Sequence, residues 1–238
     1  MVEAVSVAPS AEPAADPTIV LSRSTLTGNL WKGELVVYVS ATAAVTPTTK
    51  AKPNPKADAR VAIKAAAGAV GWVGPRTVVA GDDEGVLAVW EWKGDGSLER
   101  VARGFDHDDM ISSIDCDGGG TVLTASYDGS LQMWHAGGAG VDSTARFDGH
   151  TAAVHCGRLH QPDGGGLGHA VISGSLDGTV RLWDARKPYS SVAAVPVSGH
   201  GAVTAVEWLG GATALAGAAD GTVHLIDIRS LGAGGGGG

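Results

Sequence analysis

The chain has 238 residues, of which 44% are hydrophobic, and it carries a net charge of -8. A chain of this length can bury a substantial core, and β architectures of this size are often single domains. The negative charge disfavours binding to nucleic-acid phosphates except through a local basic patch. No stretch approaches the roughly 18 apolar residues of a membrane span, and no secretory signal is present at the start. We therefore expect a cytoplasmic and nuclear protein.

The two ends of the chain differ in composition from the middle. Residues 1–17 are rich in Ala, Pro, Glu and Ser, which bury too little apolar surface to offset the entropy lost on ordering, so this segment is expected to be disordered. Residues 232–238 are glycine except for Ala233 and predict a flexible tail. Residues 18–231 are the expected folded domain, interrupted at 46–58 by a lysine-bearing insert that is typical of a flexible, solvated loop.

The folded region repeats one strand-turn-strand pattern. In chain order the hairpins read NLWKGELVVY, VAGDDEGVLAVW, LTASYDGSLQMW, VISGSLDGTVRLWDAR and LAGAADGTVHLIDIR. An Asp-Gly pair between two β-rich runs is the strongest short-range hairpin signal, because the turn needs a positive φ that glycine adopts without steric cost. The sequence therefore predicts a series of β-hairpins ending near residues 38, 90, 134, 183 and 226.

The spacing of the hairpins indicates a repeat architecture. Their last strands end at Tyr38, Trp90, Trp134, Trp183 and Ile226, which are 52, 44, 49 and 43 residues apart. A period of roughly 40 to 45 residues with a strand-turn-strand signature ending in Trp-Asp is typical of a β-propeller of WD repeats.

LWDAR, with Gly149-His150 and Gly199-His200 opening two repeats, resembles the WD-repeat family. The resemblance implies an all-β propeller with about five blades present. Seven blades of about 42 residues would need about 300 residues, so we expect a fragment of a seven-bladed ring. The alternative is a complete ring that closes with five blades, which propellers permit in principle.

Polar residues also recur once per repeat, and they resemble the family's structural tetrad, in which a histidine bridges a turn aspartate and a hydroxyl on the second strand. The first set is His150, Asp177, Trp183 and either Ser173 or Ser175. The second set is His107, Asp128, Trp134 and either Thr124 or Ser126. The fifth repeat keeps His200 and Asp220 but has Ala216, Ala218 and Ile226 at the other positions, so its blade should be the least rigid.

A Ser-His-Asp combination could also indicate a hydrolase. A nucleophile needs one exposed constellation beside an oxyanion hole, whereas these sets recur with a tryptophan in successive repeats, as a buried and satisfied network would. The sequence also lacks a nucleotide-binding loop and a metal-ligand cluster. We therefore expect no catalysis and no cofactor or metal, and we expect the function to reside in surface binding.

A narrower resemblance concerns the methylosome type of WD-repeat protein. It rests on LTGNLWKGELVVY, GAVGWVGPRTVVAGDDEGVLAVWEW and FDHDDMISSI, in that order. It implies a non-catalytic scaffold that binds a type II protein arginine methyltransferase and presents substrates such as histone tails and spliceosomal proteins. The predicted turn of the first hairpin contains Trp31, and the resemblance implies that the methyltransferase docks there. The alternative is that this indole folds back over the rim of the first blade.

A second interpretation concerns two D-x-R boxes, Asp184-Ala185-Arg186 and Asp227-Ile228-Arg229. They resemble the paired boxes of WD-repeat substrate receptors of cullin-type ubiquitin ligases. In that interpretation, Arg186 and Arg229 bind the ligase adaptor. The simpler alternative is that both arginines only form salt bridges with nearby acids, in a general WD-repeat adaptor.

Overall fold

The computed structural model describes residues 2–7, 18–27, 30–38, 59–63, 65–93, 97–137, 140–160, 169–189, 191–197 and 201–231. These residues form five antiparallel sheets, one for each predicted hairpin. The insert at 46–58, the tail at 232–238 and His200 lie outside the described residues. In the part of the chain that is described, no helix is long and apolar enough to cross a membrane.

The strands follow one another in chain order within each sheet. The first sheet is β1 (Val2–Val7), β2 (Ile19–Thr27), β3 (Leu30–Tyr38) and β4 (Ala59–Ile63). The second is β5 (Ala67–Trp72), β6 (Thr77–Asp82), β7 (Leu87–Trp92) and β8 (Leu98–Gly104). The third is β9 (Ile111–Cys116), β10 (Thr121–Ser126), β11 (Leu131–Gly137) and β12 (Gly140–Phe147). The fourth is β13 (Val154–Leu159), β14 (Ala170–Ser175), β15 (Thr179–Asp184) and β16 (Ala193–Pro196). The fifth is β17 (Val203–Gly210), β18 (Thr213–Ala218) and β19 (Val223–Asp227), followed by the single helical turn α2 (Ile228–Leu231).

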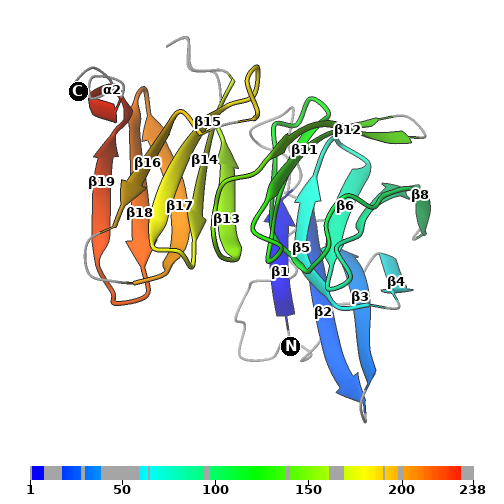
Figure 1. Cartoon of the computed structure of the whole chain (residues 1–238). Helices are drawn as coiled ribbons and strands as arrows, with labels where there is room; N and C mark the ends of the chain where they lie inside the picture. Colours follow the sequence, from blue (N-terminus) through cyan, green and yellow to red (C-terminus); the bar gives the residue numbers. More distant parts are fainter. Residues whose placement is uncertain are drawn as a thin grey trace, which may run out of the picture.

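The five sheets are the blades of a partial β-propeller (Figure 1). The first strand of each sheet packs against the first strand of the next, from β1 through β5, β9 and β13 to β17. Among the described residues, no comparable packing joins β17 to β1. In Figure 1 the blades follow one another in chain order from blue to red.

The core lies between the blades. We call the side of a sheet that packs on the following blade its rear face, and the side that packs on the preceding blade its front face. Between the fourth and fifth sheets, the rear-face residues Ile172, Val180 and Leu182 form one buried cluster with the front-face residues Ala214 and Ile226. Each of the other three junctions holds an equivalent apolar cluster. Burial of these alternating apolar faces is what holds successive blades together.

The predicted glycine turns are present at the tips of the hairpins in the third, fourth and fifth blades. Gly129, Gly178 and Gly221 have φ values of 87°, 78° and 87°, in the left-handed region that only glycine adopts at low cost. All three residues follow an aspartate and connect the second strand of a sheet to the third. We call the side of the propeller that carries these tips the hairpin face.

The N-terminal segment differs from its prediction. Val2–Val7 is strand β1, and it pairs antiparallel with β2 as the innermost strand of the first blade. Residues 8–17 lie outside the described part. Residues 1–17 as a whole are rich in Ala, Pro, Glu and Ser, but VEAVSV alone contains three valines, which favour a pleated strand. Averaging over 17 residues concealed this short run.

The first hairpin also differs from its prediction. The sequence placed the turn around Trp31, but β3 runs without interruption from Leu30, and Trp31 pairs with Leu26 of β2. β2 ends at Thr27, which pairs with Leu30 at the start of β3. Gly33 also lies within β3, where a β carbon would collide with the carbonyl oxygen of Ala65.

Candidate functional site

The fourth blade brings together a complete tetrad. His150 contacts Oδ2 of Asp177 through Nδ1 at 2.8 Å and Oγ of Ser173 through Nε2 at 2.8 Å. The indole Nε1 of Trp183 donates to the same Ser173 hydroxyl at 2.8 Å. Ser173 is fully buried, and Trp183 is 1% exposed. The structure thus selects Ser173 rather than Ser175, whose hydroxyl instead donates to carbonyl oxygens at the start of the blade.

The third blade repeats this arrangement. His107 contacts Asp128 at 3.0 Å and Thr124 at 2.7 Å, and the indole of Trp134 donates to the Thr124 hydroxyl at 2.9 Å. Thr124 is fully buried, whereas the alternative hydroxyl of Ser126 donates to the carbonyl oxygen of Asp109. Both sets join the loop before the blade, the hairpin turn and the two middle strands.

The hydrogen bonds of the fourth-blade tetrad fix the direction of its protons. Trp183 can only donate, so the hydroxyl hydrogen of Ser173 is free to point at Nε2 of His150. His150 then donates from Nδ1 to Asp177 and is neutral. Burial lowers the pKa of His150 and outweighs the opposing effect of the hydrogen bond that His150 donates to Asp177. Burial would raise the pKa of Asp177, but hydrogen bonds from Thr179 and His150 outweigh it and lower that pKa to about 2.

This geometry does not present a nucleophile. The Ser173 hydroxyl is fully buried, and it is engaged by the indole of Trp183 on one side and by His150 on the other. A catalytic serine must reach the substrate carbonyl beside an oxyanion hole. The tetrads therefore have a structural role: in the third and fourth blades they link the hairpin to the loop before it.

The second and fifth blades lack the hydroxyl. Trp90 pairs with Val78 in the ladder, as Trp134 does with Val122 and Trp183 with Val171. Two residues further along β6, the hydroxyl position holds Ala80, and the buried indole nitrogen of Trp90 has no hydrogen-bond partner among the described residues. In the fifth blade, Ile226 and Ala216 are apolar and buried. The lower rigidity expected of that blade stays a prediction.

In both D-x-R boxes, the arginine forms a salt bridge with the aspartate of the same box. Arg186 donates to the two oxygens of Asp184 at 2.9 and 2.7 Å, and Arg229 donates to those of Asp227 at 3.0 and 2.7 Å. The hydrogen bond from Arg186 lowers the pKa of Asp184 to about 2. The salt bridges of the simpler interpretation are therefore present, and the two arginine side chains are still 67% and 77% exposed.

The hairpin face carries large exposed apolar side chains. Tyr127 and Leu176 precede the turn aspartates of successive blades and are 37% and 48% exposed. The loop before β9 adds Phe105, which is 65% exposed, and the exposed acids Asp108 and Asp109. This loop lies against the hairpin tips, because the backbone nitrogen of Asp108 donates to Asp128. Exposed aromatic residues beside charged ones are typical of protein interfaces.

The first hairpin is longer than the others. β2 and β3 have nine residues each, against five to seven for the middle strands of the other blades. β1 pairs with β2 only as far as Arg23, and β4 pairs with β3 only from Gly33. The segment that contains Leu26 and Trp31 is therefore a two-stranded tip beyond its own sheet, and Figure 1 shows it projecting past the other blades. The side chain of Trp31 lies outside the described part.

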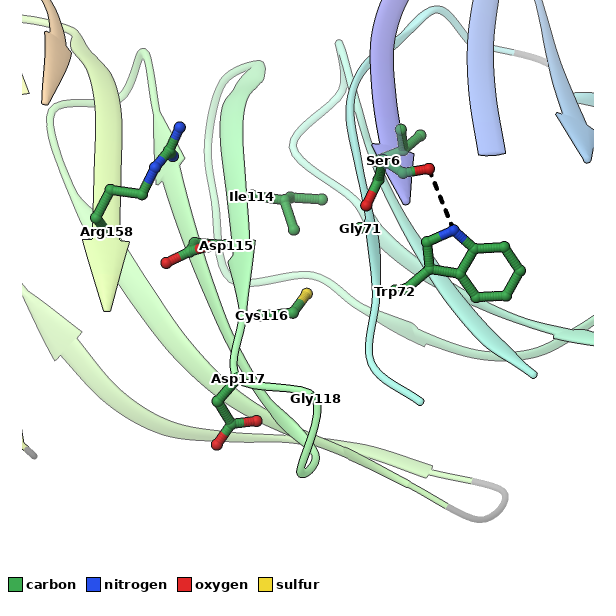
Figure 2. A pocket seen from close by; sticks show the side chains of 10 residues that line it. Ser6, Gly71, Trp72, Ile114, Asp115, Cys116, Asp117, Gly118 and Arg158 are labelled. Atoms are coloured by element: carbon green, nitrogen blue, oxygen red, sulfur yellow. Dashed lines mark hydrogen bonds between the residues drawn. The ribbon is translucent and has the colours of Figure 1, made fainter. Parts of the chain in front are cut away.

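A polar cavity lies at the inner strands, and the sequence analysis did not find it. It has a volume of about 330 Å³, and Figure 2 shows Ser6, Gly71, Asp115 and Arg158 around it. These four residues hold equivalent ladder positions in successive inner strands. Burial raises the pKa of Asp115 against a hydrogen bond from the backbone of Leu159. The available signal was a charged residue within an inner strand, Asp115 in ISSIDC and Arg158 in VHCGRL.

Comparison with known proteins agrees with this architecture. The family description "WD domain, G-beta repeat" matches residues 99–135, 142–184 and 192–227, which cover the last three blades. Together with the five sheets, the match identifies the class: the chain is a WD-repeat protein with a β-propeller fold.

Three curated proteins are similar to the chain over different shares of its length. Methylosome protein WDR77 of Xenopus laevis is 25% identical over 177 residues, which are 73% of this chain and 49% of that protein. Ribosome biogenesis protein YTM1 of Ajellomyces capsulatus is 37% identical over 95 residues, which are 33% of this chain and 18% of that protein. Nuclear distribution protein PAC1 of Fusarium vanettenii is 28% identical over 48% of this chain and 26% of that protein. The chain thus spans about half the length, or less, of these relatives.

Proposed function

We propose that the chain is a non-catalytic interaction scaffold that docks a protein arginine methyltransferase through its first hairpin, as a methylosome subunit. The observation that carries the proposal is the similarity to Methylosome protein WDR77. It extends over 73% of the chain, whereas the similarity to the ribosome biogenesis protein covers 33%.

The shape of the first blade supports this docking site. Its hairpin tip is a two-stranded projection that no outer or inner strand flanks in the described residues. Trp31 lies in this tip, opposite Leu26. A tryptophan on a protruding element is the residue type most enriched among interface hot spots.

The hairpin face also suits the presentation of basic substrates. The exposed acids Asp106, Asp108 and Asp109 follow Phe105 in the same loop. Such a surface attracts cationic segments and speeds their association. Histone tails and the basic tails of spliceosomal proteins are the substrates that we propose for the complex.

The experiment is a paired measurement on Trp31→Ala. We expect binding to the methyltransferase to weaken by about 2 kcal/mol or more, with little change in melting temperature. Tyr189→Ala is the matched control, because Tyr189 is 94% exposed but lies at the other end of the strands, after β15. Equal affinities for the two variants would remove Trp31 from the interface.

The second candidate is a substrate receptor of a cullin-type ubiquitin ligase. It is favoured by the repetition of the D-x-R geometry in two successive blades, with both guanidinium groups exposed. The double variant Arg186→Ala/Arg229→Ala tests it in co-purification from the native cell. Loss of a cullin adaptor from the purified complex would support the receptor, and retention of a methyltransferase alone would support the scaffold.

A further inference from the structure

A second cavity shares two wall residues with the polar cavity at the inner strands. It has a volume of about 370 Å³, and Asp115 and Arg158 line both cavities. Its walls also include His160, Glu207 and Trp208. These residues lie near the ends of β9, β13 and β17, and each of these ends pairs with the start of the second strand, away from the hairpin face. The second cavity is therefore separate from the surface that the hairpin tips present.

The positive charge in these walls is already paired. Arg158 donates from Nε to Glu207 at 3.1 Å and from a terminal nitrogen to the carbonyl oxygen of Gly157 at 2.9 Å. The two cavities together have the acids Asp115, Asp117 and Glu207 in their walls, against the single arginine. Excess negative charge attracts cations and repels anions. A ligand of these cavities should therefore be positively charged.

Two acceptors in the walls are available to such a ligand. His160 is 5% exposed, and its Nε2 lies 3.0 Å from the carbonyl oxygen of Gly211, which can only accept. Nε2 therefore carries the hydrogen, and the buried Nδ1 is an acceptor without a partner among the described residues. Asp115 accepts from the backbone nitrogen of Leu159 at 2.8 Å, which leaves most of its capacity unused. Burial raises the pKa of Asp115, so a bound cation would stabilise its ionised form.

Contacts between blades hold both acceptors in place. Asp115 points from β9 towards β13, which carries Arg158, and its bond to the Leu159 backbone joins the third blade to the fourth (Figure 2). The ring of His160 packs edge-on against that of Trp208, with centroids 4.7 Å apart, and joins the fourth blade to the fifth. The indole of Trp208 also donates to the carbonyl oxygen of Arg158 at 3.4 Å. Because Asp115 and His160 both face a strand within the described blades, their positions do not depend on what borders the outer side of the fifth blade.

We propose that this cavity binds the guanidinium group of an arginine side chain. A guanidinium is planar, carries five N–H donors and has no acceptor, so it can donate to Asp115 and to Nδ1 of His160 at once. Trp208 adds an aromatic ring, a group on which a guanidinium stacks more readily than an ammonium does. A structural metal site would need more ligands, and the part of the chain that the structure describes holds no group of three metal-ligating side chains. The proposal does not rest on the methyltransferase contact, which involves the first hairpin.

The test is isothermal titration calorimetry of the 238-residue chain without any partner protein. The probes are arginine blocked at both ends, the equivalent blocked lysine, and blocked citrulline, which has the shape of arginine without its charge. Blocked arginine should bind at least tenfold more tightly than blocked lysine, and citrulline should not bind measurably. Citrulline that binds as well as arginine would overturn the proposal. So would binding of an arginine flanked by glycines in a peptide but not of the blocked amino acid, because recognition would then lie in the peptide backbone.

Two wall variants locate the site. Asp115→Asn keeps the shape and the acceptor for Leu159, and should weaken arginine binding at least tenfold by removing the charge. His160→Phe keeps a ring against Trp208, removes Nδ1 and should also weaken binding. The matched control is Asp108→Asn, the same change at an exposed acid on the hairpin face, which should bind like the wild type. Weaker binding by the control, with Asp115→Asn unaffected, would place the arginine on the hairpin face and overturn the proposal.

A measurement on the wild type does not depend on how the variants fold. The chain has seven tryptophans, and each indole N–H gives a signal in a nitrogen-15 correlation spectrum. Addition of blocked arginine should shift the signal of Trp208, which lines the cavity, and leave that of Trp183, which is buried in the tetrad, in place. Trp208→Phe assigns the signal by its loss. An unchanged Trp208 signal at a saturating arginine concentration would overturn the proposal.

Discussion

The fourth and fifth blades have hairpins of the same sequence pattern and strand pairing, but they differ in the tetrad and in the burial of the rear face. Ile172 pairs with Leu182 in one ladder, and Leu215 pairs with Leu225 at the same position in the other. In the fourth blade, a tetrad ties the hairpin to the preceding loop, and the rear face is buried. In the fifth, the Trp slot holds Ile226, and the rear-face residue Leu225 is 68% exposed. Strand pairing is therefore local, whereas rigidity and burial depend on neighbouring residues and blades.

The largest expected effect is the loss of the fourth-blade tryptophan. Trp183→Ala should lower the free energy of unfolding by about 3 to 5 kcal/mol, because it removes a large buried side chain, leaves a cavity and deprives Ser173 of a donor. Guanidinium denaturation monitored by far-UV circular dichroism measures this. A smaller loss of unfolding free energy for Trp183→Ala than for Ile226→Ala in the fifth blade would contradict this expectation.

The equivalent substitution in the fifth blade should cost less. Ile226→Ala should lower the free energy of unfolding by about 2 kcal/mol or slightly more, because less volume is lost and no hydrogen bond is broken. The same denaturation experiment on both variants gives the ordering. If Ile226→Ala proved the more damaging, the tetrad would not be what distinguishes the two blades.

Removing the hydroxyl isolates the polar part of the difference. Ser173→Ala leaves the buried indole of Trp183 and Nε2 of His150 without partners, and should cost roughly 1 to 2 kcal/mol. The reciprocal change, Ala216→Ser, adds a buried hydroxyl beside Ile226, which cannot donate to it. It should therefore also destabilise, by about 1 kcal/mol. A stabilising Ala216→Ser would mean that the fifth blade supplies a partner for the hydroxyl.

The smallest expected effect is on pH dependence. The pKa of His150 is lowered below 6.5 in the folded chain, so unfolding takes up a proton and stability falls as pH falls below 6.5. The pKa of Asp177 is lowered from 3.8 to about 2, which adds a further loss as pH falls from 3.8 towards 2. Denaturation midpoints between pH 7 and 5 measure the histidine contribution. His150→Gln, which does not titrate there, should show a shallower fall, and an identical fall would exclude His150 as its source.

The repeat could be read from the sequence because its signals are local. Asp177-Gly178 and its equivalents set a turn that needs a positive φ, and the alternating apolar residues of Thr179–Asp184 set a strand. The tetrad histidine, aspartate and tryptophan were also predictable, because their spacing recurs with the hairpin. The choice between Ser173 and Ser175 was not, since both hydroxyls lie on one strand and only the position of His150 selects between them.

The first blade shows where local signals fail. Trp31 was expected in a hairpin turn, but it lies in strand β3, where the carbonyl oxygen of Ala65 leaves no room for a β carbon on Gly33. Val2–Val7 resembles part of a disordered segment, but it is a strand because β2 and β5 provide it with a ladder and a packing surface. In both cases the deciding contact comes from a residue distant in sequence.

The sequence by itself determined the five hairpins, their order and the histidine, aspartate and tryptophan of the tetrads, because turn chemistry and side-chain alternation act over a few residues. Tertiary structure alone decided which apolar residues are buried. Val180 and Val223 occupy the same position in the same pattern, yet one is 3% exposed and the other 70%. The physical reason is that a strand buries its side chains only where another blade covers them, and that cover comes from outside the hairpin.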